Sequence, residues 1–342
     1  MNMSDHAKRY QLFAQEAKDS SPLYEHLAWK ISEDMDMLRL SGHAAKGQPE
    51  PNLFLGAVHY LLLQGRDHSL QAFYPSLVEN PADYQQVFPE FKDFCTTHQS
   101  SIIDILESKR VQTNEVRRCA YLYPIFCGIF KQTNKPLSLI EIGTSAGLQL
   151  LVEQYSYSYG DGIIYGNPSA ALHITSRVRK GKKPPHLAIR PSIVSRVGVD
   201  LHCCDVTKAS DYNWLRALIW PENQERVELL ASAVEQLKKS PPCLLEGDGV
   251  KRIVDLSKQA PADSIVCIFH THVANQIPLE VKNKLMDNLQ QIAKHRDVIH
   301  IYNNMSDRNL HIDAYINGEE HMYNLGETDG HGRWFDWEWQ NK

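Results

Sequence analysis

The stretch LIEIGTSAGLQLL, residues 139–151, decides how this chain folds, because it joins an apolar run to a helix-like run through a glutamate and two glycines. The apolar run at 137–143 predicts a strand, and 145–155 predicts a helix. Gly143 and Gly147 lack a β-carbon, so the backbone between them can turn sharply and a ligand can approach it closely. The start of the following helix offers backbone N–H groups and the positive end of the helix dipole, which suit a carboxylate or a phosphate.

Further apolar runs alternate with helix-like segments after this stretch. They predict strands at 199–206, 243–249, 264–272 and 297–304, and helices at 213–239, 249–259 and 278–296. Continuous apolar strands separated by helices are typical of a parallel sheet covered on both faces. The last two runs, LHIDAYING and EEHMYNLGE, meet around Asn317–Gly318, which predicts an antiparallel hairpin. The sequence therefore predicts an α/β fold with a mostly parallel sheet of seven strands that ends in this hairpin.

The chain before the first strand has a different pattern. Residues 1–135 repeat apolar side chains every three or four positions and predict a helical N-terminal domain, whereas 136–342 form the sheet domain. Within the sheet domain, 156–198 is rich in Tyr, Gly, Pro and basic residues and predicts an irregular insertion. Connections of this length are usually functional or mobile.

Composition excludes several classes of protein. A net charge of −5 over 342 residues argues against a protein that coats nucleic acid. The seven cysteines show no C-x-x-C spacing, which favours buried thiols in a reducing compartment. The N-terminus has no apolar core of signal-peptide length, and the longest apolar run, FLGAVHYLLL, is too short to span a bilayer. We therefore expect a cytoplasmic protein without a membrane partner.

The pattern Glu-x-Gly-x-x-x-Gly in the opening stretch resembles the first motif of the Rossmann-like S-adenosylmethionine-dependent methyltransferases. In that class the loop wraps the methionine end of the cofactor. The resemblance implies that S-adenosylmethionine contacts Glu141, Gly143, Thr144, Ser145 and Gly147. A close-packed turn between a strand and a helix would show the same pattern without any ligand.

Two acids follow the next predicted strands. The methyltransferase resemblance implies that Asp205, at the end of VDLHCCD, holds the ribose hydroxyls, since one carboxylate can accept two hydrogen bonds. It also implies that Asp248, at the end of CLLEGD, lies near the adenine. Each acid has an alternative interpretation: Asp205 as the cap of the following helix, and Asp248 as a turn residue.

Several stretches together resemble one bacterial family that is catalogued as domain of unknown function 2332. They are AVHYLLLQGRDHSLQAFYPS (57–76), QTNEVRRCAYLYP (112–124), EIGTSAGLQLL (141–151), WLRALIWPE (214–222), CIFHTHVANQ (267–276) and HGRWFDWEW (331–339). The resemblance covers nearly the whole chain and implies a methyltransferase-like fold, but it brings no established reaction.

The end of the fourth predicted strand, FHTHVANQ, carries candidates for catalysis. His270 and His272 would point to the same side of a strand that continued this far, and a histidine titrates close enough to neutral pH to serve as a base. Capping of strand and helix ends is the alternative. Two histidines could also bind a metal, but no clear third ligand is nearby, so we expect none.

A second polar group lies just before an apolar helix, in QTNEVRR. Asn114 and Glu115 are candidates for substrate contacts there, with a helix cap and solvated charges as the alternative. The strand end FHTHVANQ lacks the Asn/Asp-Pro-Pro-aromatic run of nucleic-acid amino-methyltransferases, which favours a small-molecule acceptor.

The leading hypothesis is therefore a methyltransferase that uses S-adenosylmethionine and a small-molecule substrate. One alternative is a nucleotide or metabolite sensor that kept the fold and lost catalysis. Another is an RNA-binding accessory protein, in which a basic cluster of the insertion holds nucleic acid. This cluster is Arg177, Arg179, Lys180, Lys182, Lys183, Arg190 and Arg196.

Overall fold

The structure, a computed structural model, describes residues 3–112, 114–338 and 340–341, with side chains described up to 338. It divides into two compact units. The first unit combines the residues before Asn114 with Val206–Glu228, and the second combines Asn114–Asp205 with the chain from Leu229 onward. This division differs from the predicted boundary at 135, because the helix before the first strand belongs to the second unit.

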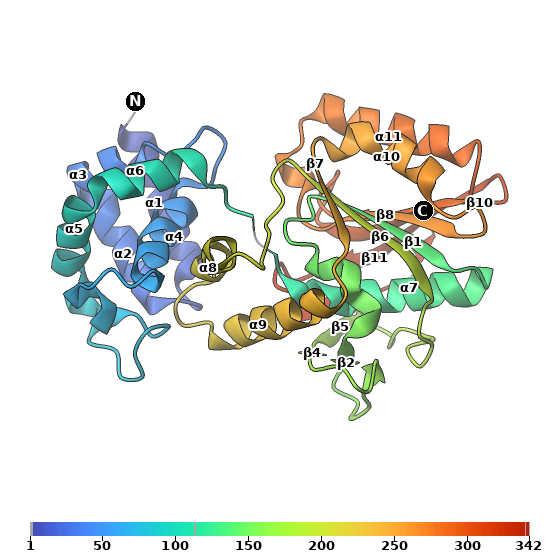
Figure 1. Ribbon diagram of the computed structural model, residues 1–342, viewed down its shortest axis with the longest axis horizontal. Helices are drawn as coiled ribbons and strands as arrows, with labels where there is room; N and C mark the ends of the chain where they lie inside the picture. The colour runs from blue at the N-terminus through green and yellow to red at the C-terminus, as the bar shows by residue number, and fades with distance from the viewer. Residues whose placement is uncertain (1–2, 113, 339, 342) are drawn as a thin grey trace. The chain divides into compact units, whose positions relative to one another are not determined.

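The first unit is helical (Figure 1). Its helices are α1 (Met3–Ala17), α2 (Pro22–Glu33), α3 (Met35–Ser41), α4 (Glu50–Leu63), α5 (Val87–Thr97), α6 (Gln99–Ser108) and α8 (Ala209–Ala217), with 3₁₀ turns η1 (Ser69–Phe73) and η2 (Tyr84–Gln86). Local sequence sets the helix starts. The side chain of Ser21 accepts a hydrogen bond from the Tyr24 N–H, and Pro22 occupies the first turn, where no N–H is needed.

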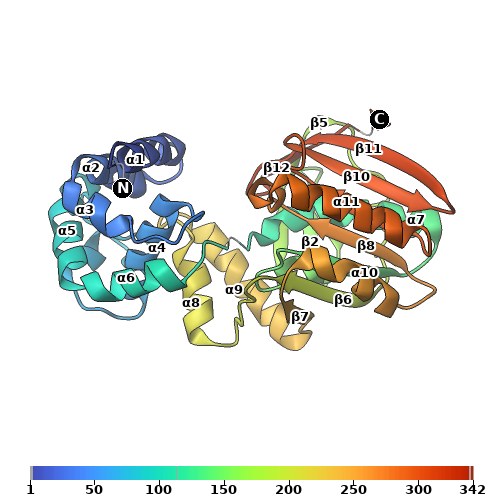
Figure 2. The ribbon, with the colours of Figure 1, turned by 90° about the horizontal axis from the view of Figure 1, so that it is seen from above.

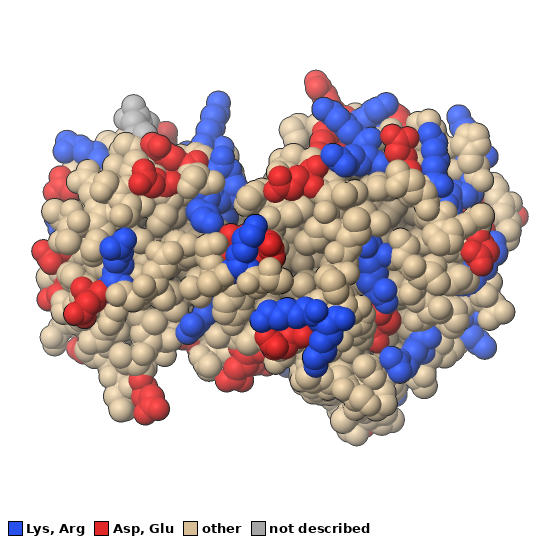
Figure 3. Space-filling model, in the orientation of Figure 1, with Lys and Arg blue, Asp and Glu red and all other residues tan. Residues whose placement is uncertain are grey.

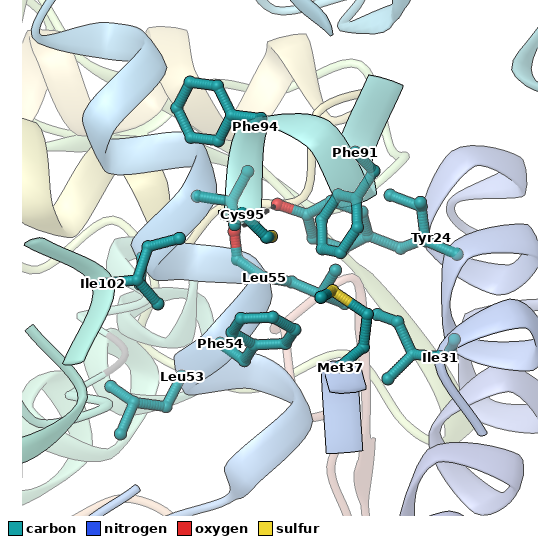
Figure 4. Packing of buried hydrophobic residues seen from close by; sticks show 14 of the residues in the cluster. Tyr24, Ile31, Met37, Leu53, Phe54, Leu55, Phe91, Phe94, Cys95 and Ile102 are labelled. Atoms are coloured by element: carbon teal, nitrogen blue, oxygen red, sulfur yellow. Dashed lines mark hydrogen bonds between the residues drawn. The ribbon is translucent and has the colours of Figure 1, made fainter. Parts of the chain in front are cut away.

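Nearly every residue of α4 is buried in the core of the first unit. Figure 4 shows Leu53, Phe54 and Leu55 of this helix among apolar neighbours such as Phe91 and Ile102. Phe54 packs edge-on against Phe91 of α5, with ring centroids 5.7 Å apart. The run FLGAVHYLLL is therefore a buried core helix, which explains why it is apolar on all sides. Among the described residues, no helix is long and apolar enough to cross a membrane.

The second unit contains an eight-stranded sheet with the order β13-β11-β10-β9-β8-β1-β6-β7. The strands are β1 (Leu137–Ile142), β6 (Ile193–Asp200), β7 (Cys243–Glu246), β8 (Ile265–His270), β9 (Val298–Tyr302), β10 (Asn309–Ile316), β11 (Glu319–Glu327) and β13 (Gln340–Asn341). Five neighbouring strands, β9, β8, β1, β6 and β7, pair in parallel. Strands β10, β11 and β13 pair antiparallel. The protein thus has the predicted α/β fold with a mostly parallel sheet, and β13 adds one strand to the seven predicted.

Helices cover both faces of this sheet (Figures 1 and 2). Helices α10 (Gly249–Gln259) and α11 (Leu279–Ala293) pack on the face that carries Ile140 and Ile268. Helix α7 (Cys119–Thr133) packs on the opposite face, where Phe126 lies edge-on to Phe269. Because side chains alternate along a strand, these two faces collect different residues of β1 and β8.

The segment after β1 does not form the predicted α-helix at 145–155. It forms the 3₁₀ turn η4 (Leu148–Gln154), in which Leu151 leaves the helical region with φ −97° and ψ 20°. The single helix predicted over 213–239 forms as two helices, α8 and α9 (Gln224–Lys239).

The insertion is ordered rather than irregular. Strands β2 (Ser156–Ser158), β3 (Tyr165–Gly166) and β4 (His173–Thr175) form a small sheet, and β5 (Arg177–Gly181) pairs with β12 (Trp334–Trp337). Its last predicted residues belong to β6, which begins at Ile193.

A pair of buried histidines stands on the α10/α11 face near the carboxyl ends of β8 and β9. His270 Nε2 lies 3.1 Å from His300 Nε2, and both side chains are fully buried. Burial, assisted by the charge of Lys282, lowers the pKa of His270 to about 4. Burial also lowers the pKa of His300 well below its usual value, and His270 adds to this effect.

These shifts predict that acid destabilises the protein. A histidine whose folded pKa is depressed binds more protons in the unfolded state, so its contribution to stability is full above pH 6.5 and is lost as the pH falls toward 4. For His270 the loss at pH 5 relative to pH 7.5 is about 2 kcal/mol. Urea unfolding at the two pH values measures it. The pH dependence should be smaller in His270→Gln and unchanged in His321→Gln, which alters a half-exposed histidine. An equal change in the free energy of unfolding between the two pH values in all three proteins would contradict the prediction.

Candidate functional site

The order of the parallel strands marks one edge of the sheet as the candidate site. Counted along the chain, β1, β6, β7, β8 and β9 are the first to fifth parallel strands, and in the sheet they run third, second, first, fourth, fifth. The direction of the connections therefore reverses between β1 and β8. In open parallel sheets, ligands bind beyond the carboxyl ends of the strands at such a reversal.

The loop after β1 turns the chain out of the sheet through three left-handed residues. Gly143, Ser145 and Gly147 have φ of 73°, 51° and 79°. A β-carbon added at Gly143 would lie 2.5 Å from Val273 Cγ2, and one added at Gly147 would lie 2.8 Å from Leu244 Cδ2. Both glycines are therefore required by conformation and packing, and the space beside each is filled by the protein's own side chains.

The acid on β1 stays in the interior. Glu141 is buried and accepts a hydrogen bond of 2.6 Å from the Thr144 hydroxyl, while Thr144 packs where a side chain at Gly198 would stand. Burial raises the pKa of Glu141 to about 8, against the opposing effects of the Thr144 hydrogen bond and of Arg118. This shift favours the neutral form of the carboxyl, which holds the loop through Thr144.

The acid at the end of the second parallel strand is Asp200, not Asp205. Strand β6 ends at Asp200, whose carboxylate accepts hydrogen bonds from the backbone N–H of Ser145 (2.8 Å) and of His202 (3.2 Å). The prediction that the strand runs on to Asp205 was wrong, because the chain turns away after β6. Asp200 thus links the carboxyl end of β6 to the loop after β1.

Asp248 caps helix α10. Its side chain accepts hydrogen bonds from the N–H groups of Val250 and Lys251, so Asp248 is a helix cap, whereas the alternative interpretation had it as a turn residue. A carboxylate in this position also favours the positive end of the helix dipole. The carboxylate of Asp248 therefore serves as the cap at the start of α10.

His270 and His272 do not share a side of the sheet. Strand β8 ends at His270, which points to the α10/α11 face and meets His300. His272 lies beyond the strand with φ 57°, and the N–H of its backbone donates to Asn303 Oδ1 at 2.7 Å. Burial, with Arg118 and His331 adding to it, lowers the pKa of His272 to about 3.

Asn114 and Glu115 lie at the same edge, directly before η3 (Val116–Arg118). Asn114 Nδ2 donates to the Thr144 carbonyl at 3.0 Å. Glu115 is buried, accepts the N–H of Arg117, and lies 3.4 Å from His331 Nδ1. The polar residues predicted near the start of α7 therefore meet the loop after β1.

A hydrogen-bond network that the sequence did not predict connects the segment before α7 with the loops after β1 and β8. Arg118 donates to the carbonyls of Thr271 (3.2 Å) and Gly330 (2.9 Å). The Thr271 hydroxyl donates to Gln149 Oε1, and Gln149 Nε2 donates to the Glu115 carbonyl. Asn303, which orients His272, follows β9 directly; the rule that polar residues at strand ends line this edge would have found it in IYNN.

The structure thus brings together part of the predicted site. Asn114, Glu115, Thr144, Ser145 and His272 gather at the reversal between β1 and β8, joined by Asp200. His270 and Asp248 lie apart from this group. No group of three or more His, Cys, Asp or Glu among the described residues is arranged to hold a metal ion.

The loop also matches the pattern G-x-S-x-G, which in hydrolases places a nucleophilic serine on a strained turn after a strand. Such a serine needs a histidine nitrogen that can take its proton. Ser145 Oγ forms no hydrogen bond with any described atom. The pattern here therefore describes the turn and does not define a nucleophile.

The basic cluster of the insertion is partly neutralised by acids of the same unit. Arg179 donates two hydrogen bonds to buried Asp336, and its guanidinium lies 3.7 Å from the centre of the Trp334 ring. Lys183 pairs with Asp161, and Arg196 pairs with Glu153. Basic and acidic side chains are interspersed over the face shown in Figure 3.

The fold and the site together define the class of this protein: an α/β protein with polar residues at the sheet edge where the strand order reverses. The family described as "Uncharacterized protein conserved in bacteria (DUF2332)" matches residues 7–337. The chain belongs to this family. No curated protein and no solved structure matches the chain.

The packing around Gly143 gives a testable prediction. Gly143→Ala should lower the free energy of unfolding by about 1–3 kcal/mol more than Gly160→Ala, because Val273 blocks the new methyl group whereas Gly160, with a similar φ of 85°, has open space around it. Chemical denaturation measures both. Adding Val273→Ala to Gly143→Ala should recover part of the loss, and the absence of any recovery would show that packing against Val273 is not the cause.

Proposed function

We propose that this protein is an S-adenosylmethionine-dependent methyltransferase with a Rossmann-like sheet and a small-molecule acceptor. The observation that carries the proposal is the contact between Asp200 and the backbone of Ser145. It places an acid at the end of the second parallel strand against the loop after the first, beside the reversal of strand order. This is the position from which a carboxylate holds the ribose of a nucleotide cofactor.

The residues at this edge fit the cofactor on one side of the loop. Asp200 accepts two backbone hydrogen bonds at this edge, and a carboxylate is a group that can accept hydrogen bonds from ribose hydroxyls. Val273 fills the space beside Gly143, and Leu244 fills that beside Gly147, so the cofactor would lie along Ser145 and Asp200. When bound, the cofactor supplies a methyl group on a sulfonium, which is activated for displacement.

The contribution of this chain would be positioning. His272 is neutral at pH 7 and too weakly basic to remove a proton efficiently, because burial and Arg118 depress its pKa. Glu141 is held in the interior by Thr144. Holding an acceptor against the methyl group supplies a large part of the rate of a displacement, so this arrangement favours an acceptor that needs no strong base.

Calorimetry with S-adenosylmethionine and S-adenosylhomocysteine tests the proposal. Asp200→Asn should weaken binding at least about tenfold, because hydrogen bonds to a charged group contribute about 1.5–3 kcal/mol. Asn can still accept a bond from Ser145 N–H, so the loop should keep its shape. Asp248→Asn is the matched control, since asparagine caps a helix as well as aspartate and Asp248 lies at the start of α10.

Failure of both compounds to bind the unaltered protein would reject the proposal. Equal weakening by Asp200→Asn and Asp248→Asn would reject the role given to Asp200. Tight binding without methyl transfer to any metabolite in a cell extract would favour the alternative of a sensor that binds the nucleotide without catalysis.

A further inference from the structure

Two polar atoms at the reversal between β1 and β8 are buried without a partner. Ser145 is 3% exposed, and its hydroxyl oxygen meets no donor or acceptor in the part of the chain that the structure describes. The same is true of His272 Nε2. Buried polar groups in folded proteins are almost always hydrogen-bonded to protein, water or a ligand, so two unpartnered donors at one edge make this edge a candidate position for a ligand.

The proton on His272 can be placed from its neighbours. The backbone N–H of His272 can only donate, so the atom of Asn303 that it meets is the amide oxygen. That oxygen also accepts from the amide nitrogen of Asn304, and the same nitrogen lies 3.2 Å from His272 Nδ1. Since the amide nitrogen donates, Nδ1 accepts, and the proton of the neutral ring is on Nε2. His272 thus presents an N–H donor without an acceptor.

Both donors lie at the same edge of the sheet. Strands β1 and β8 are direct neighbours, with Glu141 opposite Phe269, and each donor follows the end of its strand. The loops after the two strands touch, because the side chain of Val273 lies against Gly143. Ser145 is held by Asp200 and His272 by Asn303, so both donors have a fixed place at this edge.

The positive charge of Arg118 favours an anion at the His272 end of this edge, whereas the carboxylate of Asp200 lies at the Ser145 end. Arg118 lies beside His272, where it donates to Thr271. The nearest acid on the last loop, Asp329, is held by two hydrogen bonds from the Arg333 guanidinium, which neutralise it. A hydroxyl and an N–H on two adjoining loops could donate to the two oxygens of one carboxylate.

We propose that Ser145 Oγ and His272 Nε2 form a subsite that binds a carboxylate. The assignment of this carboxylate to the methyl acceptor rests on the proposed function, whereas the subsite itself does not. A carboxylate acceptor needs no base. Its oxygen would form a bond to the methyl carbon while the bond from the methyl carbon to sulfur breaks. The positive charge of the sulfonium and the negative charge of the carboxylate would both be lost, and no proton would be transferred.

Histidine-selective ¹⁵N NMR of the full chain, titrated with benzoate, tests the subsite. The free protein should show His272 with its proton on Nε2, and benzoate should shift that signal saturably. Benzamide has the same shape without the charge and should bind at least about tenfold more weakly, as expected for the loss of a charge-assisted hydrogen bond. No saturable shift with benzoate, or equal shifts with benzamide, would overturn the proposal.

Variants separate the hydroxyl from the backbone. Ser145→Ala and Ser145→Gly both remove the hydroxyl, but glycine accepts the φ of 51° more easily, so loss of benzoate binding in both would be due to the hydroxyl. His272→Phe keeps a ring and removes the donor, and it should also weaken binding at least about tenfold. His321→Gln is the control and should bind benzoate as the unaltered protein does. Unchanged affinity in both Ser145 variants would remove Ser145 from the subsite.

Repeating the titration with saturating S-adenosylhomocysteine identifies the source of the carboxylate. If benzoate still binds, the subsite serves the acceptor. If S-adenosylhomocysteine abolishes the benzoate shift while 5′-methylthioadenosine, which lacks the amino-acid end, does not, the subsite serves the carboxylate of the cofactor. Both results support a carboxylate subsite. Absence of any cofactor binding would reject the methyltransferase proposal and leave the benzoate result to stand alone.

Discussion

The left-handed backbone at Gly143, Ser145 and Gly147 is the constraint on which the carboxyl edge of the sheet depends. It forces the chain out of the sheet directly after β1, which leaves room for the loop after β8 to pack against it. The turn is stabilised from inside by the hydrogen bond between Thr144 and Glu141 and from outside by that between Ser145 and Asp200. A non-glycine residue at the middle position keeps the turn while adding a hydroxyl to the edge.

Burial then decides what each ionisable group at this edge can do. It raises the pKa of Glu141 and lowers those of His270 and His272, so all three favour their neutral forms near pH 7. The residue types alone suggest a carboxylate and two bases. In the folded protein the same residues are a hydrogen-bonded acid, a buried ring pair and a directed N–H donor.

The sequence predicts the α/β class, the alternation of strands with α10 and α11, and the importance of the loop after β1, because apolar periodicity and glycine spacing are local properties. It does not predict where β6 ends, since VDLHCCD stays apolar beyond the last paired residue; the acid at the strand end was therefore placed at Asp205 instead of Asp200. It also cannot show that the side chains of His270 and His272 lie on different sides of the sheet, because this depends on the left-handed backbone of His272 after β8. The partners of Arg118 are distant in sequence and follow only from the fold.

The first unit is discontinuous, since α8 completes a core that begins with α1. Trp214 of α8 donates to the carbonyl of Arg110, and His59 of α4 lies 3.1 Å from that of Ala217. During synthesis, the helices before residue 113 leave the ribosome long before the segment that closes their core. The core of the helical unit therefore stays incomplete until β1, the insertion and β6 have been translated, whereas the strands from β7 onward are translated after the segment that completes it.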